Sequence, residues 1–494
     1  CTFTAAQAQD NEFDLGSQRS ELQLVNPVPG KKMDHHGLVI NPTPRYMKLT
    51  GEKTVDISGG IRTVVPKHDS ERPYDDDLDF LPLLNVRSPH YKQGFPLRAA
   101  YGKMPSVNGV ENVPGAYILQ IDISGFDDTG VFYAIQTLRQ IMENPSVEGG
   151  KKLPCIKIMD APVFPYRGVV EGFYGTPWSH AVRLSLIDFY GRYKLNTYIY
   201  GPKDDPYHRQ HWRDPYPEKE ARQLRELVDR AHARGVNFYW AIHPGGDIRW
   251  TTEDRDNLVK KLEKMYDLGI RSFAVFFDDI AGEGARGEKQ AELLNYVDSV
   301  FVKKHGDIAP LLLCPTIYNR AWSGPGDKYL NALGSSLRPG IEVMWTGNTV
   351  VHTIDKESMD WINSRIKRKG YIWLNFPVND FVRDHILLGP TYGNGLDIAG
   401  DVSGFVSNPM QYAESSKIAL YSIADYTWNM KHYDWASSWD RALADLLPNE
   451  TAALRVFASY NEDLGPNGHG FRRDESRNIK PLCDRIEKGR PRSA

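Results

Sequence analysis

From about residue 165 onward, short apolar runs alternate with amphipathic segments along the chain. Eight of these runs have the length and composition of buried strands: 167–174, 196–203, 237–244, 272–279, 311–318, 341–347, 371–378 and 404–409. The intervening segments 218–235 and 256–269 have helical periodicity, and each ends on a glycine that suits a helix C-terminus. Eight strand-then-helix units in about 265 residues predict a (β/α)₈ barrel. A doubly wound open sheet is the alternative, but it usually carries a glycine-rich phosphate loop after its first strand, and this sequence has none there.

The pattern before the barrel is different. Strand-like runs at 37–42, 54–59 and 115–125 are separated by turn-forming residues, and one amphipathic helix is predicted from Gly130 to Met142. These features predict a small α/β domain. The resulting division is an N-terminal segment (1–22), an α/β domain (23–160), the barrel (161–432) and a helical C-terminal region with a disordered tail (433–494).

Composition and charge narrow the function classes. Hydrophobic content is 41% and charged content 25%, as in an ordinary globular protein, and the chain is long enough for more than one domain. The formal net charge is −3 without a basic block, which argues against charge-driven binding to nucleic acid or anionic membranes. No apolar run approaches the length of a membrane-spanning helix. The four cysteines form no CxxC pair, so we expect neither a structural zinc site nor a disulfide framework.

The first residues suggest export. The printed sequence begins at Cys1, and Ala6-Gln7-Ala8 has the small-x-small form that precedes a signal-peptidase cut. This stretch is interpreted as the remnant of a signal peptide, or Cys1 as the lipid-bearing first residue of an outer-membrane lipoprotein. A cloning boundary is the third interpretation. The first two predict a secreted or periplasmic protein.

Polar and aromatic side chains gather where the predicted strands end, and barrel active sites lie at those ends. The polar residues are Lys203, Asp204, Asp205, His243, Asp278, Asp279, Tyr318, Asn375, Asp380 and Asn408, and the aromatic ones are Tyr174, Trp178, Trp345 and Trp373. Flat rings beside amide and carboxylate groups suit a sugar, which offers C–H faces and hydroxyl edges. Carbohydrate is therefore the expected substrate class.

The adjacent pair Asp278-Asp279 carries the chemistry. Neighbouring strand residues point to opposite faces, so both can face one site only if the strand ends and the chain turns. The following IAGEG segment supplies such a loop. Two close carboxylates repel, which should raise the pKa of one and make it a proton donor. Adjacent residues do not easily span a sugar as the usual carboxylate pair does, but they suit substrate-assisted hydrolysis, in which the 2-acetamido oxygen is the nucleophile.

Several of these residues also have purely structural interpretations. The Asp pair can be a helix N-cap followed by a solvated acid. Asp204 and Asp205 can belong to a salt-bridged turn, the Asn residues to Asx turns, and Trp345 and Trp373 to the core. His243, in an HPGGD turn, is interpreted as structural, and Cys314 as a buried small hydrophobe. Glu171 and Glu283 form the rival acid pair, with Glu171 as the nucleophile of an ordinary retaining glycosidase.

Four long motifs, RGVVEGFYGTPWS (167–179), YIYGPKDDPYH (198–208), WAIHPG (240–245) and FAVFFDDI (273–280), resemble family 84 glycoside hydrolases. This is the O-GlcNAcase and hexosaminidase group, and the similarity is greatest to its bacterial members. The resemblance extends through GFVSNPM (404–410) to NEDLGPNGHGFRR (461–473). The C-terminal helical region is shorter here than in the longest relatives.

The resemblance implies a role for each matched residue. Asp278 would polarise the acetamide, and Asp279 would act as general acid and then general base. The implied substrate-binding residues are Gly172, Tyr174, Lys203, Cys314, Tyr318, Trp345, Val350, Trp373, Asn375, Asp380 and Asn408. Within this set Tyr318 would bond near the forming oxazoline, and Cys314, Trp373 and Tyr174 would wall the acetyl pocket.

The function implied is that of a retaining exo-β-N-acetylglucosaminidase without cofactor. Its partners would be β-GlcNAc-terminated glycans or O-GlcNAc-modified proteins. An endo-acting, hyaluronidase-like hexosaminidase and a catalytically silent GlcNAc-binding module are the alternatives.

Overall fold

The computed structural model describes residues 29–57, 61–64, 95–101, 104, 113–119, 122–144, 147, 152–383, 385–462 and 485. The interpretations of the N-terminal segment 1–22, of Cys1 and of the C-terminal tail lie outside the described residues, and so does most of the motif at 461–473.

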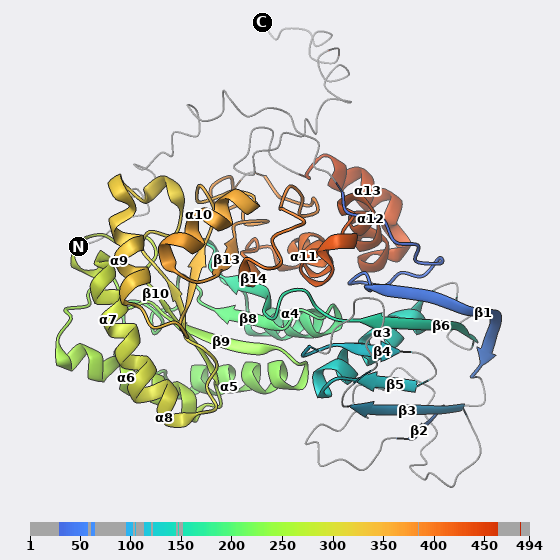
Figure 1. The fold of residues 1–494 in the computed structure, drawn as a ribbon, viewed down its shortest axis with the longest axis horizontal. Coiled ribbons are helices and arrows are strands. Elements are labelled where there is room, and N and C mark those ends of the chain that lie inside the picture. The colour runs from blue at the N-terminus through green and yellow to red at the C-terminus, as the bar shows by residue number, and fades with distance from the viewer. Residues whose placement is uncertain are drawn as a thin grey trace, which may run out of the picture.

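Residues 167–407 contain a closed barrel of eight parallel strands, which confirms the predicted (β/α)₈ architecture (Figure 1). The strands are β7 (Arg167–Glu171), β8 (Thr197–Tyr200), β9 (Asn237–Ile242), β10 (Ser272–Phe276), β11 (Leu312–Cys314), β12 (Glu342–Trp345), β13 (Gly370–Leu374) and β14 (Val402–Ser407). They follow one another around the barrel in chain order, and β14 closes it by pairing with β7. Each strand ends two or more residues earlier than its predicted run, because the polar residues at the end of that run already belong to a loop.

Helices surround the barrel, and their amphipathic faces pack on the outer side chains of the strands. They are α4 (His180–Arg192), α5 (Glu218–Ala233), α6 (Thr252–Asp267), α7 (Gly287–Val297), α8 (Lys303–His305), α9 (Lys328–Ser336), α10 (Lys356–Ile366) and α11 (Ala413–Trp428). Helix α6 begins four residues before its predicted start, because the Thr251 side chain caps it by accepting from the Asp254 backbone N–H at 3.2 Å.

The N-terminal domain is a six-stranded sheet that stands beside the barrel (Figure 1). Its elements are β1 (Tyr46–Asp56), β2 (Ile61–Val64), β3 (Phe95–Tyr101), β4 (Tyr117–Leu119), β5 (Asp122–Gly125), β6 (Lys152–Asp160) and helix α3 (Asp128–Glu143), in the strand order β1-β6-β4-β5-β3-β2. The predicted helix from Gly130 to Met142 is confirmed.

The strand predictions in this domain succeed less well. The predicted run 115–125 contains two antiparallel strands, β4 and β5, and the run 54–59 begins in the last residues of the longer strand β1. The strand predicted at 37–42 is wrong. Leu38 and Ile40 are buried, but they pack as part of an irregular segment. The apolar run in the sequence identified Leu38 and Ile40 as core positions, but it did not show whether this segment pairs with a strand.

Helices α12 (Trp435–Leu446) and α13 (Thr451–Ser459) follow the barrel, and α12 packs against α11. Trp428, the last residue of α11, lies between the barrel and the N-terminal domain. The Arg167 guanidinium carbon is 5.0 Å from the ring of Trp428 and 5.6 Å from that of Tyr133 in α3. The described parts of the barrel and of the N-terminal domain therefore share one buried junction.

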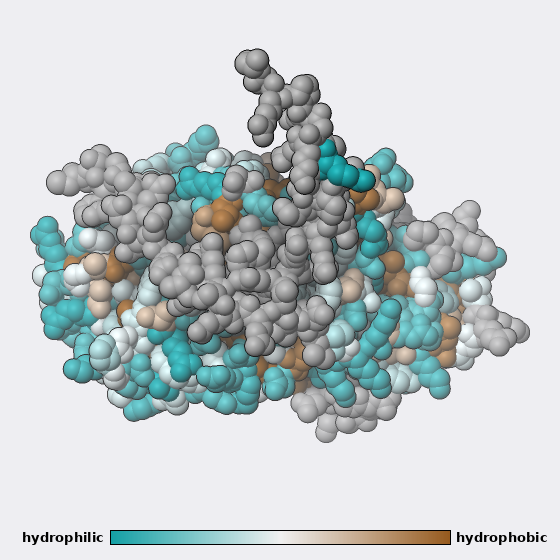
Figure 2. Space-filling model, turned by 90° about the horizontal axis from the view of Figure 1, so that it is seen from above, coloured by the Kyte–Doolittle hydropathy of each residue, from teal (hydrophilic) through white to brown (hydrophobic). Residues whose placement is uncertain are grey.

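Hydrophilic and hydrophobic residues are mixed over the described part of the face in Figure 2. Among the described helices, none combines the length and the apolar composition needed to cross a bilayer.

Candidate active site

Asp278 and Asp279 lie in a tight turn that follows strand β10. The strand ends at Phe276, and Asp279 has a φ of 55°, in the left-handed region that non-glycine residues seldom adopt. This turn breaks the alternation of a strand, so two neighbouring side chains can serve the same end of the barrel. Such a turn was expected from the adjacency of the two acids in the sequence.

Asp278 is held as a buried anion. It is 4% exposed, and the Lys203 ammonium forms an ion pair with its Oδ2. Burial works to raise the pKa of Asp278, but the Lys203 ammonium opposes it and holds that pKa well below its ordinary value. The other oxygen, Oδ1, is buried and has no hydrogen-bond partner among the described residues. Asp278 is thus charged at neutral pH and keeps one oxygen free to accept a hydrogen bond.

Asp279, in contrast, is exposed and bonded by two tyrosines. Tyr318 Oη donates to its Oδ1 at 2.7 Å, and Tyr174 Oη donates to its Oδ2 at 2.9 Å. Burial and the nearby carboxylate raise the pKa of Tyr318 well above its ordinary value, so its phenol stays protonated. From the sequence we expected repulsion between the two acids to raise the pKa of one of them. The structure adds a lysine to one of them and two phenols to the other.

A chain of amide groups borders the acid pair. Asn375 Oδ1 accepts from Trp373 Nε1 at 2.9 Å and from Asn408 Nδ2 at 3.0 Å, and Asn375 Nδ2 donates to the Val350 carbonyl at 2.6 Å. Asn408 Oδ1 in turn accepts from the backbone N–H of Gly172 at 3.3 Å. Four strand ends, β7, β12, β13 and β14, are linked in this way, and the two amides are held in fixed orientations.

Gly172 is required by the packing of the site. A Cβ at this position would lie 2.4 Å from Cζ2 of Trp373, too close for any side chain. Trp373 also packs on Phe276, with ring centroids 5.4 Å apart, and Lys203 Nζ lies 5.8 Å from the Trp373 ring. The indole therefore forms a wall next to the lysine that pairs with Asp278.

Asp380 and Cys314 complete the group. Asp380, in the loop after β13, accepts from the Tyr174 backbone N–H at 2.8 Å, and burial raises its pKa. Cys314, the last residue of β11, is buried in the same inner cluster as Tyr318 and Trp373. Burial raises the pKa of its thiol well above the ordinary value, which makes it a packing residue and a poor nucleophile.

The structure does not bring Trp345 to this site, contrary to our expectation. Trp345 ends β12, where its neighbour Met344 faces the barrel interior, so Trp345 faces the helices. It is fully buried, stacks on Trp361 at 5.5 Å and donates from Nε1 to Ser358 Oγ at 3.3 Å. Its position is that of a core residue between β12 and α10.

The rival acids lie elsewhere. Glu171 is fully buried and is bonded by Arg183 at 2.7 and 2.9 Å, which leaves it no role as a nucleophile. Glu283 is exposed and pairs with Arg286 at 3.1 Å. Asp205 accepts from Tyr200 and Tyr216, both at 2.8 Å, which fits the structural interpretation of that residue.

One residue that we had interpreted as structural lies against the acid pair. His243 Nε2 is 2.8 Å from the backbone oxygen of Asp278. A histidine followed by Pro-Gly-Gly is typical of a turn. The sequence alone does not show that this turn packs against the residues after β10.

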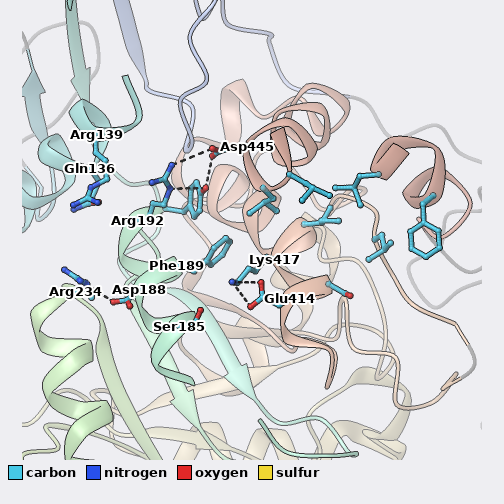
Figure 3. A pocket seen from close by; sticks show the side chains of 18 of the residues that line it. Gln136, Arg139, Ser185, Asp188, Phe189, Arg192, Arg234, Glu414, Lys417 and Asp445 are labelled. Carbon is cyan, nitrogen blue, oxygen red and sulfur yellow. Dashed lines mark hydrogen bonds and ion pairs between the residues drawn. The ribbon is translucent and has the colours of Figure 1, made fainter. Parts of the chain in front are cut away.

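A cavity of about 640 Å³ lies apart from this site, between helices α3, α4, α11, α12 and α13 (Figure 3). Six of its charged side chains form ion pairs with one another: Arg234 with Asp188, Arg192 with Asp445 and Lys417 with Glu414. It contains none of the predicted site residues. No group of His, Cys, Asp and Glu in the described parts of the chain is arranged to hold a metal ion.

Comparison with known proteins decides the family. The beta-N-acetylglucosaminidase family matches residues 167–459, and domain 2 of glycosyl hydrolase family 20 matches residues 38–161. The chain belongs to the β-N-acetylglucosaminidase family. The first of these matches contains the acid pair and every amide and aromatic residue of the candidate site. The resemblance to family 84 glycoside hydrolases is confirmed.

Individual relatives support the assignment to this family. Rat and mouse protein O-GlcNAcase are each 36% identical over 271 residues, which is 53% of this chain and 29% of theirs. The chain therefore spans under a third of the length of these curated relatives. The solved structure of CpGH84B is 32% identical with a TM-score of 0.79 and covers 91% of this chain and 80% of its own. An O-GlcNAc hydrolase mutant from Thermobaculum terrenum is 31% identical, with a TM-score of 0.60, and covers 66% and 72%.

Proposed function

We propose that this glycoside hydrolase is a retaining exo-β-N-acetylglucosaminidase that uses substrate-assisted catalysis. The observation that carries the proposal is the state of Asp278. It is a buried carboxylate, ionised by Lys203, with one oxygen lacking any partner among the described residues. A buried acceptor without a partner is costly, and the N–H of a 2-acetamido group would satisfy it.

In the first step, Asp278 Oδ1 accepts the acetamide N–H, and this orients the acetamide oxygen toward the anomeric carbon C1. That oxygen forms a bond to C1 while the bond from C1 to the leaving oxygen breaks. Asp279, protonated, gives its proton to the leaving oxygen. The products of the step are an oxazolinium ion, which keeps the N–H proton and whose positive charge faces the Asp278 anion, and the free alcohol.

In the second step, Asp279, now a carboxylate, takes a proton from water, and the water oxygen bonds to C1 as the oxazoline ring opens. C1 is inverted twice, so the β configuration is retained. The hydrogen bonds from Tyr318 and Tyr174 support this role of Asp279, because they fix the position of its carboxyl group.

The remaining residues would hold the sugar. Asn375, Asn408 and Asp380 present polar groups on one side of the acid pair, and Trp373 and Cys314 supply an apolar wall that suits the acetyl methyl group. Terminal β-linked GlcNAc, on glycans or on proteins, is the substrate class we propose. The names of the O-GlcNAcase relatives support the protein-linked form.

The test is hydrolysis of an aryl β-N-acetylglucosaminide followed by proton NMR. We expect β-GlcNAc as the first product, before it equilibrates with the α form. First formation of α-GlcNAc would contradict a retaining mechanism. Cleavage of a polymer only at internal GlcNAc units would indicate an endo-acting enzyme, and binding of GlcNAc without turnover would indicate a silent module.

A further inference from the structure

His243 is placed to control the turn that carries both acids. It follows β9, which neighbours β10 in the barrel, and it is 3% exposed. Its Nε2 lies 2.8 Å from the Asp278 backbone oxygen and 3.6 Å from Asp278 Oδ1. A carbonyl oxygen only accepts hydrogen bonds, so Nε2 carries the hydrogen and donates it to the backbone. The separation from Oδ1 is too long for a second bond, and that oxygen stays free.

The electrostatic surroundings keep His243 neutral. Burial lowers its pKa, and the nearby cations Arg209 and Lys203 lower it further, while Asp278 opposes them without restoring the ordinary value. A neutral imidazole donates a hydrogen bond without adding a second positive charge beside Asp278. Lys203 therefore remains the ion-pair partner of the carboxylate, and His243 acts on the backbone.

The neighbouring loops hold His243 itself in place. Its backbone N–H donates to the His208 carbonyl at 2.8 Å, and His208 Nδ1 donates to the Ala241 carbonyl at 2.7 Å. The next residues pack tightly on the acid turn, because a Cβ at Gly245 would lie 2.6 Å from Cδ1 of Ile280. The loop after β9 thus forms a rigid support for the turn after β10.

We infer that His243 is a positioning residue for the acid pair: its Nε2–H fixes the peptide after Asp278, and so holds the turn that directs Asp278 and Asp279 to one side. This inference rests on the proposed function, in which both carboxylates act on one sugar. The conformation benefits from such support because Asp279 has a positive φ, which residues with a side chain adopt far less often than glycine does.

Three variants test the inference. His243→Gln keeps a terminal N–H donor near the Nε2 position, whereas His243→Leu has similar bulk and no donor. His305→Leu is the matched control, because His305 lies on α8, outside the site. Its Nε2 is 2.8 Å from a carboxylate oxygen of Glu263. For each variant we would measure kcat and KM on an aryl β-N-acetylglucosaminide. We would also measure the binding of GlcNAc and of a thiazoline analogue of the oxazoline, and thermal unfolding.

We expect His243→Leu to lower kcat by roughly 10- to 100-fold with KM changed less than about threefold. We expect it to weaken thiazoline binding more than GlcNAc binding, because the thiazoline depends on the placement of Asp278. His243→Gln should recover most of the lost kcat, and His305→Leu should match the wild type. A merely structural histidine would lower the unfolding temperature without this split between kcat and KM.

Two results would overturn the inference: wild-type kcat in His243→Leu, or equal losses in the Leu and Gln variants with thiazoline and GlcNAc affinities unchanged relative to each other. If His243→Leu fails to fold, His243→Asn replaces it, since the shorter amide falls short of the carbonyl and should lose kcat as Leu would. Failure of the proposed function is seen separately, in the anomer that the wild-type enzyme releases.

Discussion

Among the described residues there are two buried lysine–aspartate pairs whose electrostatics are opposite. Lys194 and Asp160 lie where the N-terminal domain meets the barrel, with Lys194 Nζ 3.9 Å from Asp160 Oδ2. Lys203 and Asp278 lie in direct contact beyond the C-terminal ends of strands β8 and β10. Burial lowers the pKa of Lys194 to about 8 and raises that of Asp160. In the site, attraction overcomes burial, so the pKa of Lys203 is raised and that of Asp278 is lowered.

The hydrogen bonds of the two aspartates explain the difference in their roles. Both oxygens of Asp160 are occupied, since Oδ1 accepts from Trp428 Nε1 at 2.8 Å and Oδ2 accepts from Tyr117 Oη at 2.8 Å. Asp278 Oδ1 has no partner in the described structure. The interface pair is therefore complete in itself, whereas the site pair lacks one hydrogen bond that a substrate can supply. In the proposed mechanism, the buried ion pair can bind substrate because Asp278 can still accept one hydrogen bond.

The largest expected effect separates the two aspartates. Asp278→Asn removes the anion that faces the oxazoline, and we expect kcat to fall about a thousandfold with little change in the unfolding temperature. Asp160→Asn should do the reverse, lowering stability and leaving kcat per folded molecule close to wild type. Steady-state kinetics and calorimetry on both variants measure this. Equal loss of kcat in the two would remove the distinction.

The second effect concerns the other acid. Asp279→Ala should reduce kcat/KM for a poor leaving group by about a hundredfold or more, but far less for an activated aryl group, which needs no protonation. Measuring a series of aryl glycosides with leaving groups of different pKa gives the slope for each enzyme. Equal losses along the series would contradict the assignment of Asp279 as the general acid.

A third effect comes from removing the cation. Lys203→Met leaves Asp278 buried without its partner, so its pKa should rise. Asp278 must be ionised to act, so the acid limb of the kcat/KM profile should move to higher pH, and kcat/KM at neutral pH should fall by about tenfold or more. Lys203→Arg is the control that keeps a charge. An acid limb unchanged in Lys203→Met would show that the lysine does not set the state of Asp278.

The smallest effect on activity is expected at the interface. Lys194→Met should lower the free energy of unfolding by about 3 kcal/mol, because Asp160 loses its partner, while kcat stays near wild type. The pKa of Lys194 is about 8 in the folded protein against an ordinary 10.5. Between these values the unfolded chain binds more protons, so this lysine makes stability rise with pH.

Urea unfolding from pH 8 to 10.5 tests that sign. Lys261 also has a pKa of about 8 and adds a similar rise, so Lys194→Met should reduce the slope without abolishing it. An unchanged slope would mean that Lys194 does not titrate in this range.

The sequence predicted the barrel because its parallel strands are buried on both faces and read as continuous apolar runs. It predicted the acid pair because two adjacent charges after such a run have few structural explanations. It could not distinguish Trp373 from Trp345. Both lie at strand ends, but whether each side chain faces the barrel interior or the helices depends on strand register, which the sequence alone does not give.

Other features depend on contacts between distant segments. The packing of His243 on the Asp278 carbonyl joins loops 35 residues apart, and Lys203 reaches Asp278 across 75 residues. The pKa expected from repulsion between the two acids missed the effect of that lysine for the same reason. Local patterns identify the residues of a site, whereas the partners that set their charge come from the fold.

The central claim is that Asp278 directs an attack by the substrate's own acetamide. The most direct test is hydrolysis of aryl β-N-acetylglucosaminides whose N-acetyl group carries zero, one, two or three fluorines. Fluorine withdraws electrons and weakens the acetamide oxygen as a nucleophile. We predict a steep fall of kcat/KM along the series. A flat series would mean that the enzyme supplies the nucleophile or activates water, and would contradict the role given to Asp278.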